Sequence, residues 1–485
     1  MQHAPIIPLA AAIVLGLAAL AGRAADNEPP KGLEKPLSGT WYGPLKMGAI
    51  ELRLGLVITA KPDGTYGGIL DSLDQGAKDI PMDEVTLKDK AVSFTIKPLT
   101  ITYEGTLSED GRSIKGDFKQ LGSVLPLTFQ RTEKRVENSR PQHPRKPYPY
   151  VEEDVSYQSG KGDIRLAGTL TKPNGDGPFP AVLLITGSGA QDRDETLLGH
   201  KPFLVLADHL TRRGVAVLRL DDRGVGGSTG VLTDATTDDL AGDVLAGVEY
   251  LKRRKDVLAE RIGLIGHSEG GMVAPLVASR STDVAFIVLL AAPGVGGEEV
   301  LLQQLGLVLK AEGQVSDEDL AKARERQRRI FAIVKEETDG EAIQTKLLQL
   351  EREEVAKLSE AERREYANLE AQAAAQLKML AMPWFRSFLR YDPRPTLAKV
   401  TCPVLALNGQ NDVQVAPKEN LSAIEAALKS GSNKDVTVKE LPGLNHLFQH
   451  SRTGAVSEYG RIEETFAVQA LEEISDWVLK RAGRR

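Results

Sequence analysis

One stretch, RIGLIGHSEGGMVAP at residues 261–275, limits what this chain can fold into more than any other. Its first half is short, apolar and bounded by glycine, which favours a buried strand over a helix. Its second half has the small and apolar residues of a buried helix, so Ser268 falls in the turn between the two. A turn this tight needs Gly266 and Gly270, because a side chain at either position would collide with the neighbouring element.

The stretch belongs to a longer alternation of strand-like and helix-like segments after Tyr150. The strand-like segments are nearly continuous runs of Val, Ile and Leu, such as AVLLITG, VAFIVLLAA and CPVLALNG. Strands of this kind are covered on both faces, and helical patterns such as TTDDLAGDVLAGVEYLKRRK, which opens on a Thr-x-x-Asp capping signal, separate them. The sequence therefore predicts an α/β domain over residues 151–485, with a mostly parallel, doubly wound sheet. Its functional groups are expected at the carboxyl ends of the strands.

A charged helical segment at about residues 297–397 interrupts this alternation. Charges of both signs at helical spacing are typical of a solvated helical face. Because the segment lies between two strands, we expect it to cover the carboxyl edge of the sheet as a cap. Its end carries Trp384, Phe385 and Phe388, which either line a substrate pocket or dock the cap onto the core.

The N-terminal end differs from the rest of the chain. Residues 4–21 form an apolar run, followed by the small residues Gly22 and Ala24 and a polar, proline-rich stretch. This order predicts a signal peptide over residues 1–24 and export to the periplasm or the medium, with no stable membrane association after cleavage. The alternative is an uncleaved segment that anchors the protein, since the run is close to spanning length.

Residues 37–135 carry short segments of alternating polarity, such as IELRLGLVIT and AVSFTIKP, separated by turn signals such as PDG and EDG. These patterns predict antiparallel hairpins and thus a small β-barrel or sandwich with an accessory role. A proline-rich linker over residues 136–150 joins it to the α/β domain. The formal charge of −6 gives no sign of a nucleic-acid partner, and Cys402, the single cysteine, excludes an intramolecular disulfide.

A serine in a strand-to-helix turn can act as a nucleophile when a base reaches its hydroxyl. His446 lies in the loop LPGLNHLF after the last predicted strand, where a base has to lie to reach over Ser268. His450, one helical turn further on, is the rival candidate. His267 adjoins the serine, and we expect it to point to the opposite side of the strand.

A catalytic histidine needs a buried carboxylate that fixes its tautomer and stabilises its charged form. The loop ALNGQNDVQV, after the penultimate strand, supplies Asp412. Asp221 and Asp222 in RLDDRGVGGS follow an earlier strand, and we expect them to stabilise their own turn with Arg223 as a partner. The resulting order of serine, aspartate and histidine along the chain is that of α/β-hydrolases.

A carbonyl group under attack gains negative charge on its oxygen, and hydrogen-bond donors have to receive it. One predicted donor is the backbone N–H of Glu269, at the helix N-terminus. The other comes from the loop ITGSGAQDRDE, where Ser188 is the first choice and Gly189 the alternative. The Glu269 carboxylate would oppose negative charge nearby, so we expect it to turn away and cap the helix.

Six segments of the α/β region, among them LLITGSGAQDRDE, LRLDDRGVGGSTG and GLIGHSEGGMVAP, resemble in content and order the bacterial α/β-hydrolase carboxylesterases of the EstD type, in the serine aminopeptidase-like superfamily. The resemblance spans about residues 150–485. It implies an α/β-hydrolase fold, the triad Ser268, Asp412 and His446, and a preference for esters of short acyl chains. Thr186 departs from it, because relatives usually carry histidine there, and this difference is expected to loosen the oxyanion loop.

These observations predict a serine hydrolase that cleaves carboxylic esters through an acyl-enzyme. Its expected partner is a small-molecule ester, and neither a metal nor an organic cofactor is implied. A peptidase, amidase or thioesterase would use the same triad, and a binding protein with an inactive triad is the non-enzyme alternative. Dehalogenase chemistry is excluded, because it needs a carboxylate where Ser268 stands. The natural substrate, the acyl chain length and the oligomeric state stay open.

Overall fold

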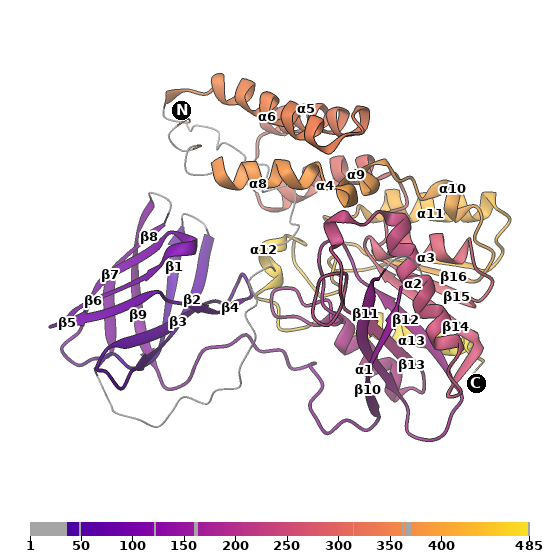
Figure 1. The fold of residues 1–485 in the computed structure, drawn as a ribbon, viewed down its shortest axis with the longest axis horizontal. Coiled ribbons are helices and arrows are strands. Elements are labelled where there is room, and N and C mark those ends of the chain that lie inside the picture. The colour runs from indigo at the N-terminus through magenta and orange to yellow at the C-terminus, as the bar shows by residue number, and fades with distance from the viewer. Residues whose placement is uncertain are drawn as a thin grey trace.

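The computed structural model describes residues 36–483, except residues 48–49, 121–122, 160–162, 314, 361–362, 364–365 and 367–369. The predicted signal peptide lies outside the described residues. The described chain forms a β-rich domain, a linker and a larger α/β domain (Figure 1). Within this part of the chain, none of the helices combines the length and the hydropathy of a membrane span.

The N-terminal domain is an antiparallel barrel, one of the two architectures that its alternating segments predict. Its strand order is β2-β1-β9-β8-β7-β6-β5-β3-β4, and pairing between β2 and β3 closes the ring. The strands are β1 (Gly39–Met47), β2 (Ile50–Ala60), β3 (Tyr66–Ser72), β4 (Ala77–Pro81), β5 (Glu84–Lys88), β6 (Ala91–Ile96), β7 (Ile101–Leu107), β8 (Ser113–Gln120) and β9 (Ser123–Thr132). Trp41, Phe94, Tyr103 and Phe129 are fully buried inside, so large side chains fill the barrel.

The α/β domain is built on one eight-stranded sheet in the order β10-β11-β13-β12-β14-β15-β16-β17. The pairs β10–β11 and β11–β13 are antiparallel, and the remaining pairs are parallel. The strands are β10 (Val151–Gln158), β11 (Arg165–Lys172), β12 (Phe179–Ile185), β13 (Ala216–Leu220), β14 (Val257–His267), β15 (Phe286–Leu290), β16 (Val404–Gly409) and β17 (Val436–Leu441). The predicted fold class, a mostly parallel α/β sheet after a β-rich domain, is confirmed.

Helices cover both faces of this sheet, because its central strands are apolar on both sides. Helices α2 (Thr237–Lys252), α3 (Gly270–Ala278) and α11 (Pro417–Ser430) pack on one face, and α1 (Pro202–Arg212) and α13 (Val468–Arg481) pack on the other. Thr236 and Asp239 form the capping box expected at the start of α2. The short helices η3 (Leu232–Asp234) and α12 (Val456–Tyr459) lie in loops of this domain.

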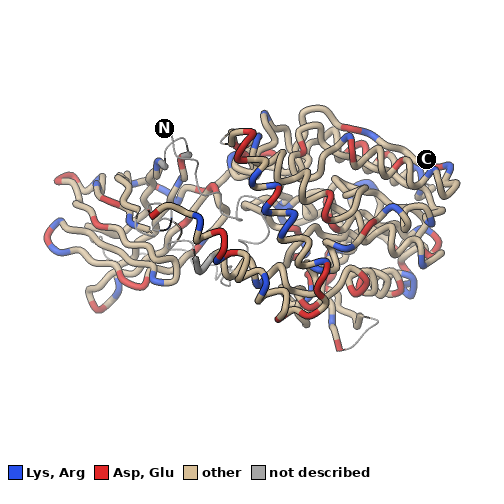
Figure 2. Tube along the Cα trace, turned by 90° about the horizontal axis from the view of Figure 1, so that it is seen from above, with Lys and Arg blue, Asp and Glu red and all other residues tan. Residues whose placement is uncertain are grey.

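The cap is inserted between β15 and β16. Its helices are α4 (Gly297–Ala311), α5 (Asp317–Glu336), α6 (Gly340–Ala356), α8 (Glu370–Leu380), α9 (Pro383–Arg390) and α10 (Arg394–Leu397). Acidic and basic residues are interspersed along the tube (Figure 2), and the pairs Arg326–Glu351 and Arg329–Glu354 join α5 to α6. The apolar faces of the cap helices form a core that also includes Met272 of α3, so the cap rests on the helix that follows Ser268.

Candidate active site

Ser268 occupies the turn between β14 and α3. Its φ of 51° lies in the left-handed region that residues with a Cβ rarely adopt. A Cβ built on Gly266 would be 2.1 Å from the carbonyl oxygen of Gly270, and one built on Gly270 would be 2.3 Å from that of Ile185. The turn therefore requires both glycines, and it holds the serine in a strained conformation at the end of its strand.

His446 and Asp412 come together from the loops that follow β17 and β16. The Nδ1 atom of His446 is 2.8 Å from Oδ2 of Asp412, and both side chains are buried. Oδ1 of Asp412 accepts the backbone N–H groups of Gln414 and Val415 at 2.8 and 2.9 Å. Because the carboxylate accepts at Nδ1, that nitrogen holds the proton and Nε2 keeps its lone pair, as a general base requires.

The loop after β12 lies directly beside the serine. A Cβ built on Gly187 would be 3.2 Å from the Ser268 Cβ. Two buried carboxyl groups hold this loop: Glu195 accepts the Gly187 N–H at 2.6 Å, and Asp222 accepts the Thr186 hydroxyl at 2.8 Å. Thr186 therefore ties down the loop that it was expected to loosen.

The rival base lies away from this arrangement. The His450 side chain is 61% exposed, and its Nδ1 is 2.8 Å from Oε2 of Glu464. The rival acid, Asp222, also accepts the backbone N–H of Gln191 at 2.9 Å, so its two oxygens serve the loop after β12. The geometry thus brings Asp412, and not Asp222, to His446.

The ion pairs predicted for the turn after β13 are wrong. Asp221 pairs with Arg193 at 2.6 Å, whereas Arg223 points to α2 and pairs with Asp243 at 2.6 Å. Arg193 lies 28 residues from Asp221 along the chain. A partner from a separate loop cannot be identified from the turn's own sequence.

Glu269 does not cap α3 as predicted. Its side chain makes no cap hydrogen bond, and it is buried against the cap, where both carboxyl oxygens accept from Trp384 Nε1 at 3.0 and 3.2 Å. Burial raises the pKa of Glu269 to about 7, although hydrogen bonds from Ser188 and Trp384 oppose the rise. The two predicted oxyanion residues, Glu269 and Ser188, are thus side-chain partners. Their role as donors to an oxyanion stays a prediction.

Comparison with known proteins places this geometry in a family. The family model described as serine aminopeptidase, S33, matches residues 201–452, just over half of the chain. The chain belongs to this family. It is 28% identical over 364 residues to the esterase EstD of Thermotoga maritima, which covers 74% of each chain. It is also 34% identical over 115 residues to the putative hydrolase YtaP of Bacillus subtilis, covering 20% of this chain and 38% of that protein.

Solved structures similar to this S33 family member include the esterase Pf2001 of Pyrococcus furiosus. That alignment covers 71% of this chain and 97% of the esterase, with 18% identity and a TM-score of 0.42. The α/β-hydrolase GrgF from Penicillium sp. sh18 aligns over 68% of this chain and 99% of its own, with 17% identity and a TM-score of 0.43.

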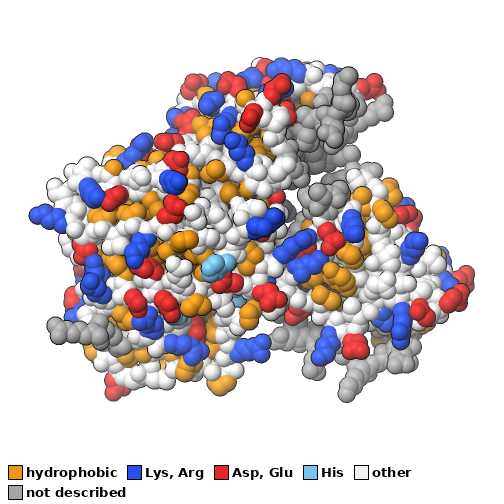
Figure 3. Space-filling view, turned by 180° about the vertical axis from the view of Figure 1, so that it is seen from behind, with side chains coloured by type: hydrophobic (Ala, Val, Ile, Leu, Met, Phe, Trp, Pro, Cys, Tyr) orange, Lys and Arg blue, Asp and Glu red, His pale blue; other side chains and the backbone are white. Residues whose placement is uncertain are grey.

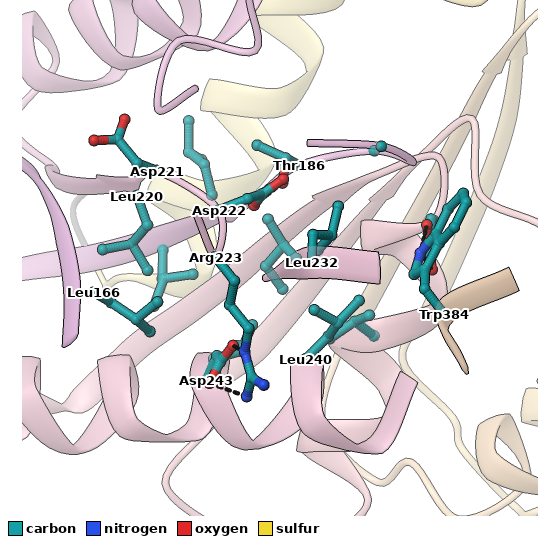
Figure 4. Close-up of a pocket in the computed structure, with 18 residues that line it drawn as sticks. Leu166, Thr186, Leu220, Asp221, Asp222, Arg223, Leu232, Leu240, Asp243 and Trp384 are labelled. Carbon is teal, nitrogen blue, oxygen red and sulfur yellow. Dashed lines mark hydrogen bonds and ion pairs between the residues drawn. The ribbon is translucent and has the colours of Figure 1, made fainter. Parts of the chain in front are cut away.

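In this S33 chain, a partly open pocket adjoins Glu269 and the loop after β12. Trp384 stands at one side of the pocket, and the ion pair of Arg223 and Asp243 lies at the other (Figure 4). Apolar side chains from β11, β13, η3, α2 and α3 supply much of the remaining wall, namely Leu166, Leu220, Leu232, Leu240, Val244 and Val273. The pocket is therefore largely apolar, but the carboxyl groups of Asp221, Asp222, Asp243 and Glu269 also line it.

The three aromatic residues of the cap have different surroundings. Trp384 lines the pocket, whereas Phe385 and Phe388 are buried among the cap helices beside Phe331. Neither Phe385 nor Phe388 lines this pocket, and both pack in the apolar core of the cap. A role in substrate binding for these two residues stays a prediction.

His267 does not turn away from the site, contrary to the prediction. Its ring centroid is 4.8 Å from that of His446, and its Nε2 donates to the His446 carbonyl oxygen at 3.0 Å. Its Nδ1 is 2.9 Å from Oε1 of Glu195, the residue that also binds Gly187. Burial lowers the pKa of His267, but the charge and hydrogen bond of Glu195 outweigh burial and leave it raised. A pair separated by 72 residues leaves no local sequence signal.

Proposed function

We propose that the chain is a serine esterase that hydrolyses carboxylic esters of small acyl groups, with Ser268 as the nucleophile. The observation that carries the proposal is the strained Ser268 turn combined with the buried His446–Asp412 pair. The family membership and the similarity to EstD support it.

In the proposed mechanism, His446 Nε2 takes the proton of the Ser268 hydroxyl as Oγ attacks the ester carbonyl carbon. The N–H groups of Glu269 and of Ser188, or Gly189 as the alternative, donate hydrogen bonds to the oxyanion. The tetrahedral intermediate collapses and the alcohol leaves with the proton from His446. Water, deprotonated by the same histidine, then attacks the acyl-enzyme and releases the acid.

The apolar wall of the pocket supports an acyl chain as the group bound there. Leu232, Leu240 and Trp384 offer contact area to methylene groups and no counter-charge to an acid. We also propose that residues 1–24 direct export, which N-terminal sequencing of the mature protein tests.

A second candidate is an aminopeptidase that uses the same triad. The carboxyl groups of Glu269, which is buried, and of Asp222, which is half-buried, line the pocket and could hold a substrate ammonium group. However, both already accept hydrogen bonds from the protein, and burial raises the pKa of Asp222 to about 8, which favours its neutral form near pH 7. Esters therefore fit the pocket better.

A substrate panel decides between the two. Purified full-length protein is assayed on p-nitrophenyl esters of increasing chain length and on aminoacyl p-nitroanilides, with Ser268→Ala as the control. We expect ester hydrolysis with kcat/KM well above that for every anilide, and none for the variant. Faster cleavage of anilides would replace the esterase by the peptidase.

A further inference from the structure

The N-terminal barrel contacts the α/β domain next to the loops that build the active site. The contact is made by the turn at residues 73–76 between β3 and β4, here termed the junction turn. Figure 1 shows β4 on the side of the barrel that faces α12, and Figure 3 shows charged side chains of both signs where the two domains meet.

The junction turn reaches two backbone segments of the α/β domain at once. A Cβ built on Gly76 would be 2.5 Å from Leu198 Cα, and a Cβ built on Gly460 would be 2.4 Å from the Asp74 carbonyl oxygen. The Asp74 carboxylate pairs with Arg53 of the barrel at 2.6 Å and lies 3.5 Å from Arg461 Nε. The backbones of the two domains are therefore in direct contact.

Arg140 of the linker binds the same two segments. Its guanidinium donates to the carbonyl oxygens of Leu198, Gly460 and Ile462 at 3.0, 3.1 and 2.9 Å. Burial of this group lowers the pKa of Arg140 to about 10. A desolvated guanidinium that satisfies main-chain carbonyls fixes the position of all three peptide groups.

The segment at residues 459–466, here termed the strap, connects this contact to the catalytic acid. The hydroxyl of Tyr459, fully buried, accepts from Gln414 Nε2 at 3.1 Å, and the Gln414 N–H donates to Asp412 at 2.8 Å. At the other end of the strap, Gln142 of the linker accepts the Phe466 N–H at 2.9 Å. The strap is thus held by the linker on one side and contacts the Asp412 loop on the other.

Leu198 connects the contact to the oxyanion loop. Glu195, three residues earlier in the same loop, binds the Gly187 N–H and His267 as described above. His200, fully buried, joins this loop to the strap through the Tyr459 carbonyl oxygen at 2.9 Å. The Gly187 loop and the Asp412 loop therefore both contact segments that the junction turn and the linker hold in place.

We propose that the N-terminal domain is a positioning element of the active site: the junction turn and Arg140 fix the Leu198 loop and the strap, and these fix Gly187 and Asp412. The proposal rests on the proposed function, because it takes Ser268, Asp412 and His446 as the reacting groups. Displacing a base or an oxyanion loop lowers the rate of the chemical step, whereas the pocket wall from β11, β13, η3, α2 and α3 keeps its shape.

Arg140→Met in the full-length chain tests the proposal, because it removes the donors and keeps an unbranched side chain. Well below the melting temperature we expect kcat on p-nitrophenyl butyrate to fall about tenfold or more, with KM nearly unchanged. Fluorophosphonate labelling of Ser268 should slow to a similar extent. Arg145→Met is the matched control, since Arg145 is exposed in the same linker. It should keep both rates. If Arg140→Met does not fold, Arg140→Lys, which cannot span the three carbonyl groups, replaces it.

Tyr459→Phe removes the hydroxyl that joins the strap to Gln414 and should lower kcat in the same way. Its effect and that of Arg140→Met should be less than multiplicative in the double variant, because both act through one path. A lower melting temperature of Arg140→Met with wild-type kcat and labelling rate would overturn the positioning role.

The downfield proton resonance of the His446–Asp412 hydrogen bond, assigned by its loss in His446→Ala, gives a readout without substrate. It should shift or broaden in Arg140→Met and stay unchanged in Arg145→Met. An unchanged resonance in Arg140→Met would contradict the proposal. A shifted resonance in a chain that hydrolyses no ester would instead support positioning and refute the esterase assignment alone.

Discussion

The turn around Ser268 and the cap are joined by the hydrogen bond from Trp384 to Glu269, yet they are built by different means. The turn is fixed by backbone approaches so close that no Cβ fits at Gly266 or Gly270. The cap helices pack around an apolar core and are joined by ion pairs such as Arg326–Glu351. We infer that the turn and its partners decide whether the chain reacts, and that the cap modulates which substrate it accepts.

The largest effect is expected from Ser268→Ala, which removes the nucleophile and little else. Turnover of every ester should fall by several orders of magnitude, as in other serine hydrolases. The fold should survive, because alanine keeps the Cβ that the turn already accommodates and removes only the hydroxyl. Loss of fluorophosphonate labelling with an unchanged circular dichroism spectrum is the expected result. Persistent labelling would mean that another residue is the nucleophile.

Asp412→Asn should give the next largest effect. The amide cannot stabilise a charged His446 and favours the wrong tautomer, so kcat should fall by about 10⁴-fold. His450→Ala serves as the matched control, since His450 pairs with Glu464 and makes no described hydrogen bond to His446. A harmless Asp412→Asn beside a crippling Asp222→Asn would reverse the assignment of the acid.

The sequence predicts the backbone features of the molecule well, namely the strands, the start of α2 and the turn around Ser268. Runs of Val, Ile and Leu identify strands covered on both faces, and Thr236 with Asp239 marks the start of α2. The glycines around Ser268 identify the turn, because steric exclusion is a local effect. Asp412 and His446 could also be predicted from local sequence, because each lies in the loop that follows a recognisable strand.

The side-chain contacts around the candidate active site could not be predicted from the sequence in the same way. Glu269 accepts from Trp384, 115 residues further along, instead of capping its own helix. Asp221 pairs with Arg193, and His267 with Glu195. Each of these contacts depends on how loops from separate strands come together at one edge of the sheet. The local preferences of a segment describe that segment in isolation. They do not decide the partners of a buried carboxyl group when the folded chain brings a stronger hydrogen-bond donor close to it.

Glu269 links the two regions and should make stability depend on pH. Burial raises its pKa from 4.5 to about 7, so the folded chain holds this proton more strongly than the unfolded chain does. The resulting stabilisation is complete below about pH 4.5 and is lost as the pH rises through about 7. Glu269→Gln should flatten this fall by up to about 3 kcal/mol, measured by denaturant unfolding between these pH values. Glu318→Gln, on the exposed face of α5, should leave the slope unchanged. An unaltered slope in Glu269→Gln would contradict the assignment.

The smallest effect, and the one specific to the cap, is expected from substitutions of two neighbouring aromatic residues, Trp384 and Phe385. Trp384 forms a wall of the pocket, whereas Phe385 is buried inside the cap. Trp384→Leu should deepen the pocket and shift the optimum of a p-nitrophenyl ester series toward longer acyl chains. Each added methylene group should contribute about 1 kcal/mol, or roughly fivefold in kcat/KM. Phe385→Leu should lower the melting temperature and keep the parental chain-length profile. If Phe385→Leu shifted the chain-length profile and Trp384→Leu did not, the acyl chain would lie elsewhere than in this pocket. The cap would then select substrates through the packing of its core instead of through the pocket wall at Trp384.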